Sequence, residues 1–324
     1  MRVGITGGTG FVGGHLAVCL ANQGHDVTVI TRGVDHRPLA QEVLSTKGAR
    51  LVTAGLDDKA ALSNAFAGCE AVAHCAGINR AEGNQTFEAV HVRGTENVVR
   101  AAEEAGVRRL ALLSFLRARP RCGSAYHESK WAAEEVVRAS HLEWTVLKPG
   151  MMFGRGDHML DHLTRALCTV PIFASVGHRL VRPLAVGDVV NVLQATLVVG
   201  RLRHKTVPLV GPTEIEFDDA VRTVGQALGK HVRLLRLPFS FLYAAGRLAE
   251  GLMTVPLISV AQVRILSEEV IAPVLAPDSL PTDLAPSTPF SVKTIKGEMP
   301  DCAPFRLTDL RWFATKPSSA HRRR

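Results

Sequence analysis

The chain has 324 residues, of which 46% are hydrophobic and 21% are charged. This balance excludes a fibrous or an intrinsically disordered protein, and the length is typical of two domains or one enlarged domain. The formal net charge of +8 permits an anionic partner: nucleic acid, a membrane surface or a phosphorylated ligand.

The first half of the chain alternates short apolar runs with stretches of helical periodicity, which is typical of βαβ units in a parallel sheet. Strands are predicted at 2–6, 26–31, 51–53, 71–76, 110–114 and 145–147, and helices at 11–23, 59–66, 87–105 and 125–138. We therefore predict an α/β fold, a Rossmann-like doubly wound parallel sheet with a dinucleotide crevice at the carboxyl edge of its strands.

After about residue 150 the periodicity is less regular and proline is more frequent. Helices are predicted at 185–196 and 217–228 and a strand at 206–210, whereas prolines exclude a continuous helix over 275–289. We interpret residues 1–150 as a dinucleotide-binding domain to which some later segments return. Residues 151–318 are then a smaller region that caps the substrate site, and residues 319–324 are a basic tail.

A glycine-rich run connects the first predicted strand to the first predicted helix. It consists of Thr6, Gly7, Gly8, Thr9, Gly10, Phe11, Val12 and Gly13. In such a run Gly7 forms the tight turn, Gly10 admits a pyrophosphate close to the backbone, and Gly13 lets the helix pack on the strand. The helix N-terminus presents N–H groups to the phosphates. The run predicts a dinucleotide site, and the competing interpretation is a turn without a ligand.

Thr31 and Arg32 stand at the end of the second predicted strand. An acidic residue there usually contacts a free ribose 2′-hydroxyl, whereas a guanidinium suits a 2′-phosphate. The pair therefore favours NADP(H) over NAD(H), and Arg37 is a candidate for a second contact. The competing interpretation is that Arg32 is an ordinary solvated loop arginine.

Tyr126 and Lys130 lie at the start of the fourth predicted helix, and their spacing of four places both on one face. A phenol has a pKa near 10, so proton transfer near neutral pH requires that pKa to fall by roughly 3 units. A neighbouring ammonium acts in that direction because it favours the phenolate. The pair predicts a proton relay, and the competing interpretation is a surface pair on an amphipathic helix.

With these motifs in order, the whole chain resembles the extended and atypical short-chain dehydrogenase/reductase superfamily. The further landmarks are residues 73–77 (AHCAG), 126–130 (YHESK) and 148–154 (KPGMMFG). Residues 93–98 (RGTENV), 144–149 (WTVLKP) and 287–290 (STPF) are similar to the branch that includes the nucleotide-binding accessory subunit of respiratory complex I.

The resemblance implies that Tyr126 donates or accepts a proton and that Lys130 contacts both the phenol and the cofactor ribose. It also implies that the backbone around residues 149–152 lies by the nicotinamide. The expected cofactor-binding residues are Thr6, Gly7, Gly10, Phe11, Val12, Gly13, Thr31, Arg32, Arg37, Leu56, Ala76, Gly77, Lys130, Pro149 and Met152. One departure is Gly55, which stands where relatives carry an aspartate and so removes an adenine contact.

A second departure concerns the substrate oxygen. Members that act on carbinols carry a Ser or Thr shortly past the fifth strand, but Ser114 stands slightly early here and Phe115 follows it. Ser114 and Ser124 are therefore both catalytic candidates. A donor of this kind is worth about 3 kcal/mol at an oxyanion site, so its loss predicts slower hydride transfer.

These features predict an NADP(H)-dependent oxidoreductase acting on a small or apolar carbonyl or hydroxyl substrate. Two alternatives stay open: a non-catalytic NADP(H)-binding accessory or sensor subunit, and a nucleoside-diphosphate-sugar epimerase or dehydratase. The apolar segment 237–263, with Arg233 and Arg236 before it, predicts core helices, an apolar substrate pocket or a peripheral membrane contact. A respiratory-complex partner is a further expectation, and no oligomeric state is predicted.

Metal and nucleic-acid binding are not expected. His158 and His162 lack a third ligand nearby, and the surplus charge lies mainly in residues 151–324, with 21 basic against 15 acidic side chains. The sequence has no secretory signal and no run of about 18 apolar residues. Its six scattered cysteines predict reduced thiols and a cytoplasmic protein. They are Cys19, Cys69, Cys75, Cys122, Cys168 and Cys302.

Overall fold

The computed structural model describes residues 1–33, 38–175, 177–252 and 271–304. The chain forms two compact units. Unit 1 comprises Met1–Asp157, Arg182–Glu214 and Val270–Phe290, and unit 2 comprises His158–Val181, Ile215–Glu269 and Ser291–Arg324. Unit 1 thus extends beyond residue 150 and takes two later segments. Arg37, residues 253–263 of the apolar segment and the predicted tail 319–324 lie outside the described residues.

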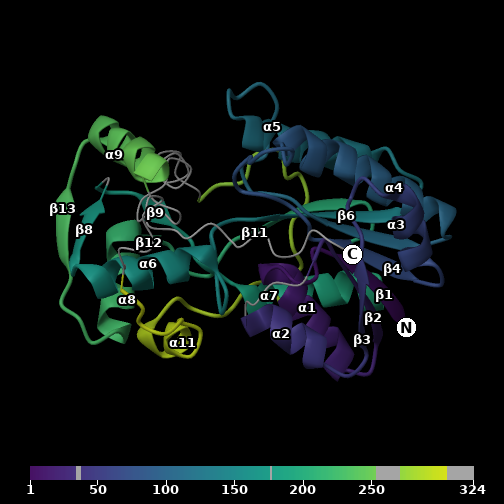
Figure 1. Ribbon diagram of the computed structural model, residues 1–324, viewed down its shortest axis with the longest axis horizontal. Helices are drawn as coiled ribbons and strands as arrows, with labels where there is room; N and C mark the ends of the chain where they lie inside the picture. The colour runs from purple at the N-terminus through teal and green to yellow at the C-terminus, as the bar shows by residue number, and fades with distance from the viewer. Residues whose placement is uncertain (34–37, 176, 253–270, 305–324) are drawn as a thin grey trace, which may run out of the picture. The chain divides into compact units, whose positions relative to one another are not determined.

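Unit 1 is built on a seven-stranded parallel sheet in the order β11-β6-β5-β4-β1-β2-β3 (Figure 1). The strands are β1 (Arg2–Thr6), β2 (Asp26–Thr31), β3 (Ala49–Thr53), β4 (Ala71–His74), β5 (Arg109–Leu113), β6 (Glu143–Pro149) and β11 (Lys205–Leu209). The strand order reverses between β1 and β4, which confirms the predicted Rossmann-like doubly wound fold. The seventh strand comes from the second half of the chain.

Unit 1 has a helix close to each of the predicted bounds and further short helices that were not predicted. Its helices are α1 (Phe11–Asn22), α2 (Pro38–Ser45), α3 (Lys59–Phe66), η1 (Glu88–Arg93), α4 (Gly94–Glu104), α5 (Ala125–Arg138), α7 (Val186–Gln194), η2 (Ala195–Val199) and η3 (Thr282–Leu284). The helix predicted at 87–105 consists of a π-helical turn, η1, followed by α4. The helix α2 was not predicted from the sequence. Two short strands, β7 (Met152–Phe153) and β10 (Leu184–Ala185), pair with each other.

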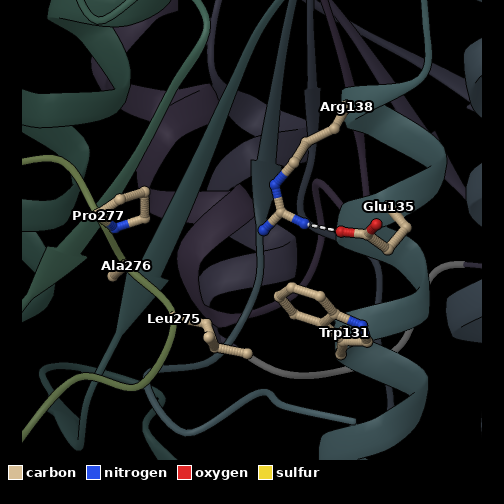
Figure 2. A pocket seen from close by; sticks show the side chains of 6 residues that line it. All are labelled: Trp131, Glu135, Arg138, Leu275, Ala276 and Pro277. Atoms are coloured by element: carbon tan, nitrogen blue, oxygen red, sulfur yellow. Dashed lines mark hydrogen bonds and ion pairs between the residues drawn. The ribbon is translucent and has the colours of Figure 1, made fainter.

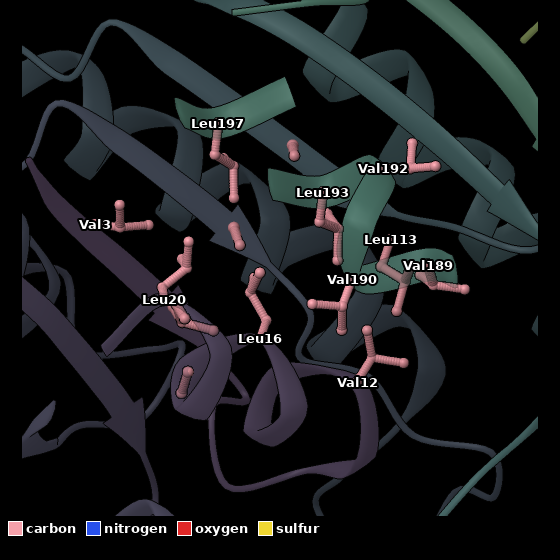
Figure 3. Close-up of a cluster of buried hydrophobic side chains, with 14 of the residues drawn as sticks. Val3, Val12, Leu16, Leu20, Leu113, Val189, Val190, Val192, Leu193 and Leu197 are labelled. Carbon is pink, nitrogen blue, oxygen red and sulfur yellow. The ribbon is translucent and has the colours of Figure 1, made fainter. Parts of the chain in front are cut away.

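Apolar side chains cover both faces of this sheet. Val3 and Ile5 of β1 pack with Leu16 and Leu20 of α1 and with side chains of α7 (Figure 3). A second cluster joins strand residues such as Val72 to α3, α4 and α5. Because successive strand side chains point to opposite faces, the two clusters lie on opposite sides of the sheet. This double burial explains the nearly continuous apolar strands.

Unit 2 contains α6 (His158–Thr169), α8 (Phe217–Ala227), α9 (Phe239–Leu252) and α11 (Val292–Lys296). Its strands are β8 (Ile172–Ser175), paired with β13 (Arg233–Arg236), and β9 (Leu180–Val181), paired with β12 (Ile215–Glu216). A disulfide joins Cys168 to Cys302, with their Cα atoms 5.9 Å apart. The prediction of six reduced thiols is therefore wrong for this pair, whose approach across 134 residues the sequence spacing does not reveal. No helix among the described residues has the length and apolarity needed to span a membrane.

Candidate active site

The predicted site residues follow strands that end at one edge of the sheet. Thr6, Thr31, His74, Leu113 and Pro149 are the last residues of β1, β2, β4, β5 and β6. These strands are parallel, so their carboxyl ends meet at the same edge. The glycine run after β1 and the helix α5 after β5 are both connected to this edge.

The glycine run forms a cradle that side chains would fill. Gly7 adopts a φ of 68°, and a Cβ there would lie 2.8 Å from the Cα of Ala76. A Cβ on Gly13 would lie 2.4 Å from the carbonyl oxygen of Gly7. Gly10 is the N-cap of α1, and no side chain caps this helix end. The first N–H groups of α1 are therefore available for a pyrophosphate, and the cradle fits a dinucleotide.

The turn after β2 is tied to the glycine run. The hydroxyls of Thr9 and Thr31 are 3.0 Å apart, and the Thr31 hydroxyl donates to the carbonyl of Gly33 at 2.8 Å. Thr31 is buried, and its hydroxyl links the turn after β2 to the glycine run. Arg32 is exposed and makes no ion pair with any residue that the structure describes. Its guanidinium is available for an anionic ligand.

The loops after β3 and β4 lie at the same edge of the sheet as the glycine run, which we call the cofactor edge. A Cβ on Gly77 would lie 3.2 Å from Lys130 Nζ, so this glycine permits a close approach of the ammonium. Leu56 packs against Gly94 and accepts a hydrogen bond from Asn97 at its carbonyl. Asp57 folds back toward Gly55, because its Oδ1 lies 2.2 Å from where a Cβ on Gly55 would stand. A carboxylate is thus present in this turn despite the glycine.

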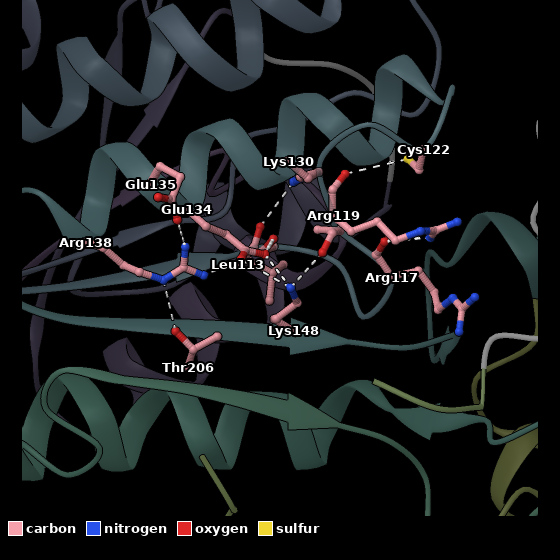
Figure 4. Close-up of polar contacts among 12 residues, drawn as sticks. Leu113, Arg117, Arg119, Cys122, Lys130, Glu134, Glu135, Arg138, Lys148 and Thr206 are labelled. Carbon is pink, nitrogen blue, oxygen red and sulfur yellow. Dashed lines mark hydrogen bonds and ion pairs between the residues drawn. The ribbon is translucent and has the colours of Figure 1, made fainter. Parts of the chain in front are cut away.

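Lys130 is buried on α5, and its Nζ donates to the carbonyl of Leu113 at 3.1 Å (Figure 4). This carbonyl is its only hydrogen-bond acceptor among the described residues, although an ammonium has three donors. Burial lowers the pKa of Lys130 to about 8. Two donors therefore remain for hydroxyl groups of a ligand, which supports the predicted ribose contact.

Tyr126 lies in an aromatic surrounding on the same helix. The ring centroids of Phe87, His91, Phe115 and His127 lie between 5.4 and 5.8 Å from its own. No described residue hydrogen-bonds its hydroxyl. Burial raises the pKa of Tyr126, whereas the Tyr-Lys spacing alone predicts a lowered pKa. The cause is the loss of solvation, because the phenol ring lies against Phe87 and Phe115.

Two buried histidines connect the glycine strand to the helix of Tyr126. His74 Nδ1 lies 2.6 Å from the Thr6 hydroxyl, and its Nε2 lies 3.0 Å from the Thr95 hydroxyl. Thr95 donates in turn to the carbonyl of His91. Burial lowers the pKa of His74 to about 3 and that of His91 to about 2, so both rings are neutral at physiological pH.

The hydrogen bonds of His91 fix its tautomer. The Ile78 N–H donates to Nε2 at 3.1 Å, so the proton of the neutral ring must be on Nδ1. Nδ1 therefore donates to the Ser129 hydroxyl at 2.8 Å, and Ser129 donates to the main-chain carbonyl of Tyr126 at 2.9 Å. This network was not predicted from the sequence. The one signal for it was a histidine within the otherwise apolar segment 71–74.

The two candidate serines have structural partners. The Ser114 hydroxyl is buried and donates to Glu134 Oε1 at 2.5 Å. Glu134 also pairs with the buried Lys148 at 3.0 Å and with Arg138 at 2.5 Å (Figure 4). The Ser124 hydroxyl caps α5 by accepting from the His127 N–H at 3.5 Å. Neither hydroxyl forms a hydrogen bond with the hydroxyl of Tyr126.

The remaining predicted residues take mainly structural positions. Pro149 is buried at the end of β6, and its carbonyl accepts from the Leu116 N–H at 2.9 Å. Val12, Phe11 and Met152 pack in or against the core cluster that α1 shares with β1. Their backbone, rather than their side chains, remains at the sheet edge.

A groove of about 520 Å³ lies elsewhere on unit 1 (Figure 2). It is lined by Trp131, Glu135, Arg138, Leu275, Ala276 and Pro277. None of these is a predicted site residue, so the groove is distinct from the cofactor edge. Within the described part of the chain, no three His, Cys, Asp or Glu side chains are grouped as a metal site would need.

Comparison with known proteins also indicates an NAD(P)-binding protein. A family described as NAD(P)H-binding matches residues 7–161. The chain is 31% identical over 255 residues to ceramide reductase from Caulobacter vibrioides, covering 77% of each chain. It is 24% identical over 271 residues to the mitochondrial 40 kDa subunit of NADH-ubiquinone oxidoreductase from Neurospora crassa, covering 83% of this chain and 72% of the subunit.

Among solved structures, UDP-glucuronic acid 4-epimerase from Bacillus cereus, in complex with UDP-glucuronic acid and NAD, superposes with a TM-score of 0.66 at 14% identity. The match covers 92% of this chain and 98% of the epimerase, and it supports the fold alone. Fold, cradle and matches together define an NAD(P)-binding protein of the oxidoreductase and epimerase type. The chain belongs to the extended and atypical short-chain dehydrogenase/reductase superfamily.

Proposed function

We propose that the protein is an NADP(H)-dependent oxidoreductase that acts on an apolar, lipid-like carbonyl or hydroxyl compound. The observation that carries this proposal is the placement of Tyr126 and Lys130 on one helix at the sheet edge. Lys130 approaches Gly77, and the backbone next to Gly77 contacts the glycine run at Gly7. In this proposal Tyr126, Lys130 and the glycine cradle act at one place.

Each residue has a distinct role in this proposal. The two remaining donors of Lys130 bind ribose hydroxyls, and its charge stabilises negative charge on the phenol. Tyr126 donates its hydroxyl proton to the substrate oxygen during reduction and accepts it back during oxidation. A bound nicotinamide cofactor would supply or accept the hydride. Arg32 binds the 2′-phosphate that distinguishes NADP(H).

The rings around Tyr126 support an apolar substrate. Phe87 and Phe115 place hydrocarbon beside the Tyr126 ring, which His91 and His127 also border. The similarity to a ceramide reductase supports the same class of substrate. A phosphorylated sugar would instead require several cationic and polar groups next to the phenol.

The proton role of Tyr126 is tested by Tyr126→Phe, with Tyr243→Phe as the matched control because the chain has only these two tyrosines. NADPH consumption is measured over a panel of long-chain ketones that also contains UDP-glucose. A general acid contributes about a hundredfold or more. We therefore expect kcat to fall at least a hundredfold in Tyr126→Phe only, with NADPH affinity retained. Full turnover by Tyr126→Phe would refute the mechanism, and turnover of UDP-glucose alone would favour the sugar-nucleotide alternative.

The cofactor preference is tested by Arg32→Glu. Loss of a charge-assisted hydrogen bond costs about 1.5 to 3 kcal/mol, so NADPH should bind at least tenfold more weakly. NADH should bind at least as well as before, since it lacks the 2′-phosphate and a carboxylate at this position can accept from the free ribose hydroxyl. Equal weakening of both cofactors, measured by nicotinamide fluorescence, would contradict a 2′-phosphate contact.

A non-catalytic NADP(H)-binding accessory subunit is the second candidate. It is favoured by the Ser114 hydroxyl, which donates to Glu134 rather than toward a substrate, and by the similarity to a subunit of NADH-ubiquinone oxidoreductase. This candidate predicts a melting temperature that rises with NADPH, no turnover across the panel, and co-purification with a membrane complex. Substrate-dependent NADPH oxidation would exclude it.

A further inference from the structure

The helix α9 of unit 2 exposes an apolar stripe. Phe241, Leu248 and Leu252 are 61%, 65% and 47% exposed. Their spacing of seven and four residues places them on one side of the helix, and the exposed Ala244 lies on the same side. Leu242 is buried at 2% exposure and faces the interior. The helix therefore has an inward anchor and an outward stripe that no described residue covers.

Basic side chains accompany this stripe. Arg247 is exposed on α9, and Arg233 is exposed on β13, which precedes the helix. Residues 229–252 contain four Lys or Arg and a single acidic residue, Glu250. An exposed β13 side chain, Leu235 at 52%, adds further apolar surface to the same unit. Phenylalanine and leucine on one side of a helix, with Arg247 on the same helix, suit the interface of an anionic bilayer.

A second copy of the chain is a poorer fit to this surface. Fourteen residues make a helix about 21 Å long, so a stripe about 10 Å wide offers on the order of 200 Å². A stable protein interface needs about 800 Å² on each partner. A bilayer, in contrast, accepts a few apolar side chains at a time and gains from each neighbouring cation.

We propose that the stripe of Phe241, Leu248 and Leu252 on α9 docks the protein on an anionic membrane surface. The helix lies in the plane of the interface, with the three side chains inserted among the acyl chains and Arg247 at the level of the headgroups. This inference goes beyond the proposed function, because docking needs neither cofactor nor substrate. It would bring the protein to the phase in which a lipid-like substrate resides.

The test is sedimentation of the full chain with sucrose-loaded vesicles of phosphatidylcholine and phosphatidylglycerol. The test variant is Phe241→Ser/Leu248→Ser. The matched control is Leu44→Ser/Val199→Ser, because Leu44 and Val199 are also exposed, at 41% and 66%, but lie in unit 1. We expect the wild type and the control to bind and the test variant to partition at least tenfold less. All three should bind NADPH equally, which shows that they are folded.

Two results would overturn the proposal. One is that the test variant and the wild type sediment to the same extent, which includes the case in which neither sediments. The other is a wild-type dimer that the test variant converts to a monomer in light scattering, since the stripe would then be an interface between copies. Neither result bears on Tyr126, so failure of docking and failure of the proposed reaction are distinguishable.

Discussion

Replacing Lys130 with methionine should change how the stability of the cofactor-free protein depends on pH. Burial lowers the pKa of Lys130 from 10.5 to about 8. Below about pH 8 the folded protein holds a buried ammonium and bears the full cost of its desolvation. As the pH rises from about 8 to 10.5, the folded state releases this proton before the unfolded state does, so the wild type becomes more stable.

The size of the effect follows from the two pKa values. Their separation corresponds to about 3 kcal/mol in all, of which about 1.3 kcal/mol appears between roughly pH 7 and 9. Burial also raises the pKa of Cys75 from 9.0 to about 12, which lowers the stability of the wild type above pH 9. Between about pH 7 and 9 the pH dependence of stability therefore reports mainly on the titration of Lys130. Over it the stability advantage of Lys130→Met should shrink by about 1.3 kcal/mol.

Urea unfolding at constant ionic strength measures this difference. Unit 1 holds Lys130 together with Trp131 and Trp144, so tryptophan fluorescence follows its unfolding. Lys47→Met is the control, because Lys47 is exposed on the same unit, and its curve should run parallel to that of the wild type. Parallel curves for Lys130→Met and the wild type would refute a desolvated ammonium at this position.

Three further predictions concern the same unit. Gly13→Ala should abolish NADPH binding in a fluorescence titration, because the new Cβ would lie 2.4 Å from the carbonyl oxygen of Gly7. Gly187→Ala is the control and should bind NADPH normally, because the space around Gly187 is open. His91→Leu should cost about 1 to 3 kcal/mol in urea unfolding, because the Ile78 N–H loses its acceptor and the Ser129 hydroxyl loses a donor. His91→Asn keeps a donor and an acceptor and should cost less. Ser114→Ala should lower the free energy of unfolding by about 1 to 3 kcal/mol, because it removes a donor from Glu134. Its kcat should stay within a few-fold of the wild-type value. A hundredfold loss of kcat would show that this hydroxyl acts on substrate.

Local spacing was enough to predict the sheet and the cradle. The glycine run, the strand ends and the Tyr126–Lys130 pair all depend on residues within about thirty positions of one another. The turn around Gly13 and the helix of Tyr126 therefore appear in the structure as expected. The predicted fold and superfamily are confirmed for the same reason, because βαβ units are read from one segment at a time.

Features that depend on distant segments were not predicted. The Cys168–Cys302 disulfide joins residues 134 positions apart. The partner of Ser114 is Glu134, whose burial depends on Lys148 from the next strand. The histidine network likewise requires β1, β4 and η1 to be packed together before its donors and acceptors meet. No spacing rule within a single segment contains this information.

Tyr126 shows how both kinds of information act on one group. Helical spacing correctly places Lys130 on its face, and an isolated helix in water would allow the ammonium to lower the phenol pKa. Phe87 and Phe115 come from other segments and remove the water that the phenolate needs, which raises that pKa instead. Spacing thus determines which side chains share a helix face, whereas the sign of the pKa shift is set by desolvation. For the proposed reaction this arrangement favours a neutral phenol, which is the form that can donate a proton to a carbonyl oxygen.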